Sequence, residues 1–388
     1  MANSLTQNQL YTVLNSIASQ ATGRTDLTAT DTSSFVTVAD ITLKAGTDNV
    51  IQAISQVLSR TIFSIRPYTR KFQGLETDAI RFGNHVRKIA ICDKNWENDD
   101  RLPLTDGQSV DPWKINKPTV LQTNFYGQEV YQRSYTLFKD QLDVAFSSEN
   151  ELSQFITLVT SNCSDLIEQA HEELARMTIA NAIGGIIALN NSNQIVHLLT
   201  EYNATTGLSL TATTVYQPAN FKAFVEWAYA RMAAVSEMLT ERSIIYHNNI
   251  SGSEVSRHTP KDMQRAYIYT PTAMQIESMA LADIYNDQYL KMVPSEKVNF
   301  WQSIETPDSI NVKAGYTDAN GEPATESVTQ DAIFALICDR EMMGYTTINE
   351  WSAATPINPR GGYSNMFFHF TDRYYFDNFE NGVLFLLD

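Results

Sequence analysis

The residues best suited to chemistry lie on one predicted helix, where Glu168 and His171 stand one turn apart. A carboxylate and an imidazole at this spacing bind iron in di-iron helix bundles, which carry the motif twice and add two further glutamates. This chain has one copy, and Ala175 stands where a zinc protease would place its second histidine. The sequence therefore favours a solvated or hydrogen-bonded helix face over a metal site.

Other motifs of common enzyme chemistry are missing from the sequence. It has neither a phosphate-binding Gly-x4-Gly-Lys-Ser/Thr loop nor a Gly-x-Gly-x-x-Gly fingerprint, and Ser253 lacks the flanking pattern of a nucleophile elbow. The remaining histidines are scattered singly, as structural histidines usually are: His85, His197, His247, His258 and His369. We therefore expect no catalytic site, no cofactor, no metal and no enzymatic activity.

The composition favours a soluble protein without a nucleic-acid-binding surface. The 388 residues include 28 basic and 44 acidic side chains, a net charge of −16, whereas nucleic-acid binding needs a basic patch. Cys92, Cys163 and Cys338 lie far apart, which indicates buried free thiols in a reducing compartment. No signal sequence and no apolar run of ~18 residues is present, so we expect neither secretion nor a membrane segment.

The longest predicted element is a helix over residues 148–190. Ser148 and Glu151 form a capping-box pattern at its start, and apolar residues then recur at helical spacing. Its proposed core positions are Leu152, Phe155, Val159 and Leu166. Gly184 and Gly185 mark the place where we expect the helix to weaken or bend.

This helix is too long for most folds, since about 40 residues at ~1.5 Å each would reach ~60 Å. It carries too many charges to span a bilayer, and no second stretch of similar length offers a coiled-coil partner. The sequence therefore predicts a spine helix with mixed elements packed along it.

Residues 70–138 are predicted to form a long hairpin. Strand patterns over 79–91 and 119–131 flank a polar, turn-rich stretch from Trp96 to Lys117. A structureless loop of about 20 residues is unusual inside a compact domain. We therefore expect the hairpin to leave the body and to lie on a neighbouring molecule.

Charge is unevenly distributed along this hairpin. Residues 60–94 carry a net charge of +5, and residues 95–112 carry −4. The candidate contact residues are Arg70, Lys71, Arg87 and Lys88 near the base and Glu97, Asp99, Asp100, Asp106 and Asp111 at the tip. An extended hairpin separates its tip from its base by more than the ~8 Å screening length, so we expect the tip to meet basic residues of an adjacent subunit. The alternative is a solvated acidic loop without a partner.

The rest of the chain is predicted to mix helices and strands. The first 60 residues should form a helix ending near Gly23, an extended or mobile segment over 22–37, and a helix capped by Asp48. Further on, a helix should begin at Pro218 and another at Thr270-Pro271. The predicted strands of this part are 243–247, 266–269, 332–338 and 382–387, the last in an aromatic-rich tail.

This order of elements resembles the major capsid protein of tailed bacteriophages, which has the Hong Kong 97 fold. The similarity is strongest to the capsid proteins of short-tailed, podovirus-type phages. It rests on residues 124–138 (Asn-Phe-Tyr-Gly-Gln-Glu-Val-Tyr-Gln-Arg-Ser-Tyr-Thr-Leu-Phe) leading into residues 154–159, and on the ending 358–387, which starts Asn-Pro-Arg-Gly-Gly-Tyr. The order matches over nearly the whole chain.

The resemblance implies an α+β fold of the Hong Kong 97 type, with a long spine helix, an extended β-hairpin loop, a peripheral domain and an axial domain. The implied parts are an N-terminal arm (1–69), the extended loop with its base strands (70–138), the spine helix of the peripheral domain (139–190), the axial domain (191–340), and the C-terminal return to the peripheral domain (341–388). Arg360, in the loop 358–362, is a further candidate for a subunit contact.

The implied function is that of a self-assembling head subunit of the virion. Such subunits form hexamers and pentamers that close an icosahedral shell around packaged double-stranded DNA, without sequence-specific binding and without a membrane. Assembly would take place in the bacterial host cytoplasm, with a portal and, since the N-terminal arm is short, a separate scaffolding protein. The alternatives are another phage assembly protein, such as a tail tube or sheath component, and a soluble enzyme, which lacks a site.

Overall fold

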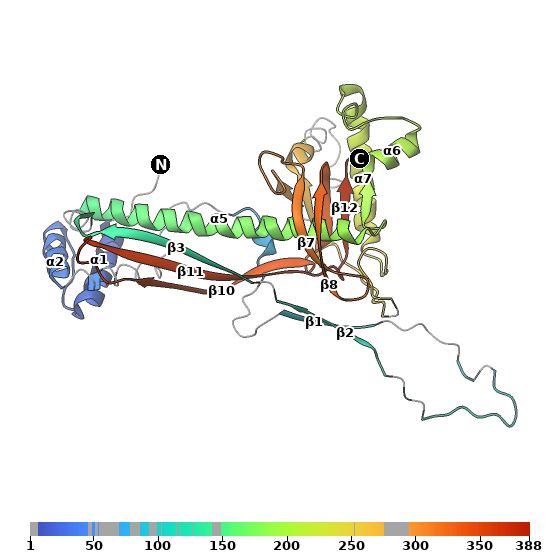
Figure 1. Cartoon of the computed structure of the whole chain (residues 1–388), viewed down its shortest axis with the longest axis horizontal. Helices are drawn as coiled ribbons and strands as arrows, with labels where there is room; N and C mark the ends of the chain where they lie inside the picture. Colours follow the sequence, from blue (N-terminus) through green and yellow to red (C-terminus); the bar gives the residue numbers. More distant parts are fainter. Residues whose placement is uncertain are drawn as a thin grey trace. The chain divides into compact units, whose positions relative to one another are not determined.

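The computed structural model describes most of the chain, and these residues form two compact units (Figure 1). The described residues are 7–45, 49–50, 53, 70–77, 86–92, 99–101, 103–113, 115, 117–126, 128–141, 149–251, 253–274 and 295–388, the side chains of 7, 9, 86, 149–164, 295 and 350 excepted. Unit 1 comprises Met1–Phe82, Gln128–Leu174 and Tyr345–Arg373, and unit 2 comprises Gly83–Gly127, Ala175–Gly344 and Tyr374–Asp388.

Unit 1 begins with two packed helices, α1 (Gln7–Thr22) and α2 (Thr32–Lys44). The predicted first helix is confirmed, but the extended segment expected over 22–37 is wrong from Thr32 onward. Asp31 caps α2 by accepting the Ser34 backbone N–H at 2.7 Å, and the Ser34 hydroxyl accepts the Asp31 N–H at 3.0 Å. Ser34 takes the place of the usual glutamate in this capping box. The Ser/Thr-rich composition of the segment therefore favoured an extended structure in the prediction, although a helix begins here. Asp48, the expected cap of the next helix, lies outside the described residues.

The sheet of unit 1 has the strand order β10-β11-β3. The strands are β10 (Met343–Ala354), β11 (Tyr363–Phe376) and β3 (Gln128–Phe138). β11 pairs antiparallel with β3 from Tyr363↔Phe138 to Arg373↔Gln128. Figure 1 shows the long helix α5 (Glu149–Leu189) running beside β3 and β11, and this helix confirms the predicted spine.

Gly184 and Gly185 do not end α5, which continues to Leu189. A Cβ atom on Gly184 would lie 2.9 Å from the Ala314 Cβ, and one on Gly185 would lie 2.5 Å from the Phe376 Cε1. The expectation that the helix weakens here is therefore wrong. The two glycines instead allow β7 (Ile310–Thr317) and the end of β11 to approach the helix backbone.

Unit 2 is built on a five-stranded sheet of order β4-β12-β9-β5-β6. Its strands are β4 (Ile195–His197), β12 (Gly382–Leu386), β9 (Ile333–Asp339), β5 (Gln264–Tyr269) and β6 (Ser295–Val298). Every residue of β9 and β12 is buried, as expected for strands covered on both faces. The strands predicted at 266–269, 332–338 and 382–387 are confirmed.

Helices α6 (Leu198–Thr206) and α7 (Pro218–Met238) share an apolar core with this sheet. Pro218 is the first residue of α7, as predicted. The strand predicted at 243–247 is wrong, because only Ser243 makes an isolated bridge, to Arg257. His247 in that segment is buried and hydrogen-bonded to Asn381 and Val255 instead.

Unit 2 also contains two antiparallel ribbons among its described residues. One pairs β7 with β8 (Pro323–Gln330), and the other pairs β1 (Val86–Ile91) with β2 (Val120–Phe125). A 3-10 turn, η1 (Gln73–Leu75), belongs to unit 1. Cys92 and Cys338 are buried free thiols, as expected, and the side chain of Cys163 lies outside the described part. The helix expected from Thr270 is seen to residue 274, where the described segment ends.

Candidate assembly surfaces

The hairpin of β1 and β2 is the first candidate surface. Its register runs from Val86↔Phe125 to Ile91↔Val120, which confirms the predicted strands 86–91 and 119–126 over most of their length. Every residue that the structure describes from Asp99 to Val120 is exposed and outside regular strands or helices until β2 begins. The loop therefore contributes little to the core of unit 2.

The acidic residues of the tip differ in their surroundings. Asp99 pairs with Arg101 at 2.5 Å, and this hydrogen bond lowers the pKa of Asp99 below its ordinary value. Asp111 accepts the backbone N–H of Trp113 at 2.9 Å. Asp100 and Asp106 are exposed, and Glu97 lies outside the described residues.

At the base of the hairpin, Lys88 is held by three carboxylates of unit 2. Its Nζ lies 2.8 Å from Glu380, 3.1 Å from Asp377 and 3.4 Å from Glu341. Burial alone would lower the pKa of Lys88, but the charges of Asp377 and Glu380 outweigh it and hold this pKa above its ordinary range. Lys88 therefore ties β1 to the segment between β11 and β12.

The other basic candidates are distributed over both units. Arg87 is exposed on β1 in unit 2, and Lys71 and Arg360 are exposed in unit 1. Asn358 fixes the loop around Arg360, since its Oδ1 accepts the backbone N–H groups of Arg360 at 3.0 Å and Gly361 at 3.1 Å.

Arg70 belongs to a polar cluster around His171 of α5. His171 is 4% exposed, and its Nδ1 lies 2.7 Å from the Arg70 Nη1. Its Nε2 lies 3.2 Å from the Thr347 hydroxyl and 3.4 Å from the Asp372 Oδ2. Arginine can only donate, so Nδ1 is the acceptor and the ring is neutral with its proton on Nε2.

Glu168 completes this cluster, because its Oε1 lies 3.5 Å from the Arg70 Nη1 and its Oε2 accepts the Arg70 backbone N–H at 3.3 Å. The expected hydrogen-bonded helix face is therefore confirmed. Within the described part of the chain, no three His, Cys, Asp or Glu side chains are grouped as a metal site requires. No helix among these residues has the length and apolarity to cross a bilayer.

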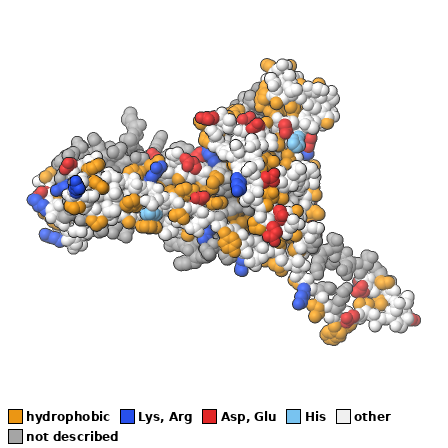
Figure 2. Space-filling view, viewed as in Figure 1, with side chains coloured by type: hydrophobic (Ala, Val, Ile, Leu, Met, Phe, Trp, Pro, Cys, Tyr) orange, Lys and Arg blue, Asp and Glu red, His pale blue; other side chains and the backbone are white. Residues whose placement is uncertain are grey.

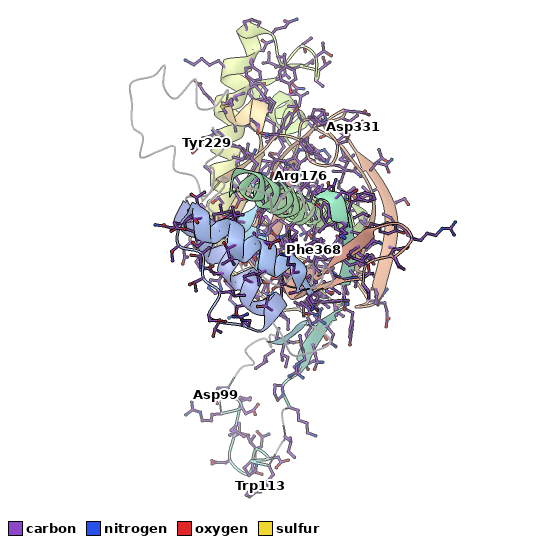
Figure 3. All side chains as sticks on the ribbon, turned by 90° about the vertical axis from the view of Figure 1, so that its left-hand side faces the viewer. Asp99, Trp113, Arg176, Tyr229, Asp331 and Phe368 are labelled. Atoms are coloured by element: carbon purple, nitrogen blue, oxygen red, sulfur yellow. The ribbon has the colours of Figure 1, made fainter. Side chains whose placement is uncertain are left out.

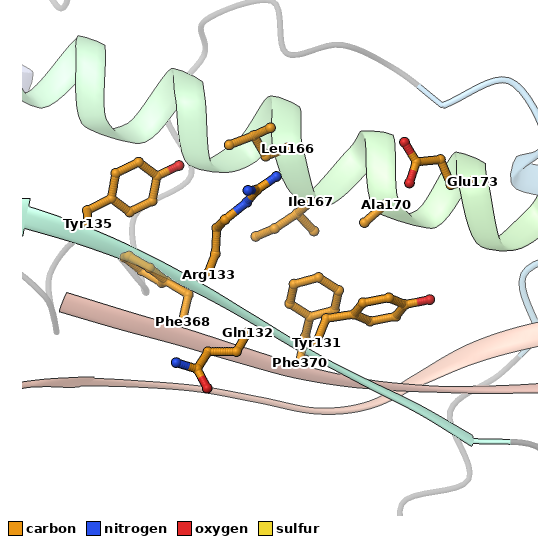
Figure 4. A pocket seen from close by; sticks show the side chains of 10 residues that line it. All are labelled: Tyr131, Gln132, Arg133, Tyr135, Leu166, Ile167, Ala170, Glu173, Phe368 and Phe370. Carbon is orange, nitrogen blue, oxygen red and sulfur yellow. The ribbon is translucent and has the colours of Figure 1, made fainter.

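A cavity of about 170 Å³ lies in unit 1 between α5 and the strands β3 and β11 (Figure 4). Leu166, one of the predicted spine-core residues, is half-buried in its wall. The side chains of Leu152, Phe155 and Val159 lie outside the described residues. The remaining lining residues are Tyr131, Gln132, Arg133, Tyr135, Ile167, Ala170, Glu173, Phe368 and Phe370.

Sequence reasoning missed two features of these surfaces. One is the cavity, whose wall joins residues more than 200 positions apart, although alternation of Tyr131, Arg133 and Tyr135 shows that they share one strand face. The other is the apolar part of the tip, where Trp113 is 84% exposed and Ile115 is 81% exposed. The prediction for the tip was based on its acidic residues and did not include these two apolar residues.

Comparison with known proteins gives the family of the chain. The model of the family described as Phi29-like phage major capsid protein matches residues 14–386. No curated protein matches the chain.

Similar solved structures include a chain from the structure of the head fiber and inner core protein gp22 of bacteriophage P68, with 10% identity and a TM-score of 0.55. A chain from the capsid structure of Staphylococcus phage Andhra has 12% identity and a TM-score of 0.54. Both alignments cover 84% of this chain and 87% of the other. At this identity the likeness concerns the fold, a mixed α+β architecture consistent with the Hong Kong 97 type. Since the family model spans nearly its whole length, the chain belongs to the Phi29-like phage major capsid proteins.

Proposed function

We propose that this chain, as the major capsid subunit of a phage head, assembles by laying its β1–β2 hairpin on a neighbouring copy. The observation that carries the proposal is the exposure of every described residue from Asp99 to Val120. A loop of this length with no core of its own is usually functional. Lys88 supports the same role, because its ion pairs fix the base of the hairpin while the tip stays available.

The subunits would form hexamers and pentamers that close an icosahedral shell around double-stranded DNA. The net charge of −16 supports enclosure without sequence-specific binding, since the DNA backbone is itself anionic. The buried free thiols Cys92 and Cys338 support assembly in the reducing cytoplasm of the bacterial host. A separate scaffolding protein and a portal would be the partners, the head would be of the short-tailed phage type, and the role would be purely structural.

The electrostatic part of this proposal concerns how the tip finds its neighbour. Lys88 and Arg70 are engaged within their own units, so exposed Arg87 and Arg360 are the better candidates to meet the acidic tip. Exposed pairs contribute only ~0–1 kcal/mol each, so they would set register and encounter rate rather than affinity.

Negative-stain electron microscopy of the expressed protein tests the assembly role. We expect shells or capsomers from the wild-type chain, alone or with a scaffolding protein. Tubes would instead indicate a tail component, and a small discrete oligomer with neither form would contradict the proposal. A variant with residues 99–117 replaced by a short Gly/Ser turn should stay folded and form no shells. Unfolding of that variant would show that the tip belongs to the subunit's own core.

A further inference from the structure

The loop of the hairpin presents a large aromatic side chain to water. Trp113 is 84% exposed, and Figure 3 shows it at the far end of the loop, beyond Asp99. An aromatic side chain buries on the order of 200 Å² of surface when a partner covers it. Covering Trp113 would therefore contribute a large hydrophobic free energy to binding. Figure 2 shows acidic and apolar side chains side by side on this end of the hairpin. Such a patch indicates an interaction site.

The backbone around Trp113 is held in place. The Asp111 Oδ1 accepts the Trp113 N–H at 2.9 Å, and Pro112 between them has a fixed φ. This local turn restrains the backbone from which the side chain leaves the loop. A restrained backbone loses less entropy on binding than a free one, so the turn favours insertion of Trp113 into a partner.

The cavity of unit 1 has the size and lining to receive one aromatic ring. Its volume is about 170 Å³, and an apolar cavity of about 150 Å³ is known to hold benzene. The walls include Leu166, Ile167 and Ala170 on α5 and the rings of Tyr131 and Phe370, which stack with centroids 5.0 Å apart.

The two charged residues that line the cavity, Glu173 and Arg133, can pair with polar groups at and beside Trp113. Glu173 is exposed, and Gln169 donates to its Oε1 at 3.0 Å, so its other oxygen can accept the indole N–H. Figure 4 shows Arg133 reaching from β3 toward α5, where its guanidinium can meet the Asp111 carboxylate or the face of the indole ring. The cavity therefore offers complementary partners for both the ring and its acidic neighbour.

We infer that the cavity between α5 and the β3–β11 pair of one subunit is the socket for Trp113 of a second copy of this chain. The inference rests on the proposed assembly role and adds to it the anchor that supplies the affinity. Trp113 is 84% exposed within its own chain, so its ring is available to a second copy. Buried aromatic anchors of this kind dominate interface energies, whereas charged rims contribute little.

Disulfide trapping tests the pairing directly. One chain carries Trp113→Cys, a second carries Ala170→Cys, and the mixture is oxidised under assembly conditions. We expect disulfide-linked dimers in the mixture and a ladder of larger products from a chain that carries both cysteines. The matched control replaces Ala170→Cys by Ile304→Cys, a residue 78% exposed in unit 2. Crosslinking no stronger than in this control, or only within single chains of the double variant, would overturn the inference.

Assembly thresholds provide the second test. Trp113→Ala should raise the critical concentration for shells at least about tenfold, while Trp113→Phe should recover much of the loss. Ala170→Trp fills the socket and should act similarly, and the double variant should be no worse than either single variant, since both remove one contact. Retained thermal midpoints exclude misfolding. If Trp113→Ala assembles at the wild-type threshold, the inference fails while the shell function stands; if the wild type forms no shells, the proposed function itself fails.

Discussion

Two antiparallel strand pairs of unit 2 use apolar residues in opposite ways. β9 and β12 pair from Gly382↔Cys338 through Leu384↔Leu336, and both strands are buried throughout. β1 and β2 also carry apolar residues, yet Ile91 is 64% exposed and its partner Val120 is 53% exposed. The first pair stabilises the subunit, and the second presents its apolar face outward.

The sequences of the two pairs already differ. β9 is a continuous apolar run (Ile-Phe-Ala-Leu-Ile-Cys), which requires cover on both faces. β1 alternates exposed Arg87, Ile89 and Ile91 with half-buried Lys88 and Ala90, which requires cover on one face only. The exposed apolar residues of this ribbon fit the proposed contact with a neighbouring copy.

The largest expected difference between the two strand pairs is the loss of unfolding free energy caused by an aspartate in each. Leu336→Asp places an unpaired charge in the buried sheet, and we expect a loss of unfolding free energy above about 4 kcal/mol or an insoluble chain. The matched change Ile91→Asp should lower it by no more than about 0.5 kcal/mol. Urea unfolding followed by circular dichroism measures both values. Equal losses would show that the hairpin is part of the subunit's core.

The second prediction concerns the ion pairs that join the two regions. Lys88→Met leaves the carboxylates of Asp377 and Glu380 in a buried site without their lysine, and we expect a loss of about 3 kcal/mol. Arg87→Met, one residue away and exposed, is the control and should change stability by less than about 0.5 kcal/mol. Hydrogen exchange should also rise in β1 of the Lys88 variant alone. Unchanged exchange there would mean that Lys88 does not anchor the hairpin.

Acid should weaken the core of unit 2 through His247, which has no counterpart in β1 or β2. Burial lowers the pKa of His247 below its ordinary 6.5, although hydrogen bonds with Val255 and Asn381 oppose this shift. The unfolded chain then binds the proton more tightly than the folded chain. The stability that His247 contributes is therefore present above pH 6.5 and is lost as the pH falls through that value toward the folded pKa.

Urea unfolding at pH 7.5 and pH 5.5 measures this effect. The loss of unfolding free energy on acidification should be smaller in His247→Gln than in the wild type. His258→Gln, at an exposed position, is the control and should keep the wild-type difference. An identical pH dependence in all three proteins would contradict the role assigned to His247.

Much of the fold could be predicted because its signals are local. The helix α5 and the buried strand β9 follow from periodicity and apolar content over a single stretch of chain. What the sequence did not reveal depends on distant partners. Gly185 is needed because the ring of Phe376 approaches the helix backbone there, and Lys88 pairs with Glu380, 292 residues away. The cavity likewise forms only when β3 and β11 are in register beside α5, so no local sequence pattern could predict it.

The smallest expected effect concerns the charges of the tip, and it separates electrostatic encounter from apolar anchoring. Asp99 already pairs with Arg101, so the informative change is Asp100→Lys with Asp106→Lys, at two exposed positions outside that pair. We expect slower assembly than wild type at low salt and an unchanged monomer stability, because exposed charges mainly steer association. The difference should shrink as ionic strength rises and the screening length falls to ~8 Å and below.

Light scattering during assembly at two salt concentrations measures these rates. Asp100→Asn with Asp106→Asn is the matched control, and it should give about half of the effect because it removes charge without reversing it. Trp113→Ala should differ from both, since the loss of an apolar anchor persists at high salt. Identical assembly kinetics of the wild type and the lysine variant at low salt would show that the acidic residues of the tip are solvated and contact no neighbouring subunit. The hairpin would then differ from the buried sheet through its apolar residues alone, and Trp113 would be its main contact.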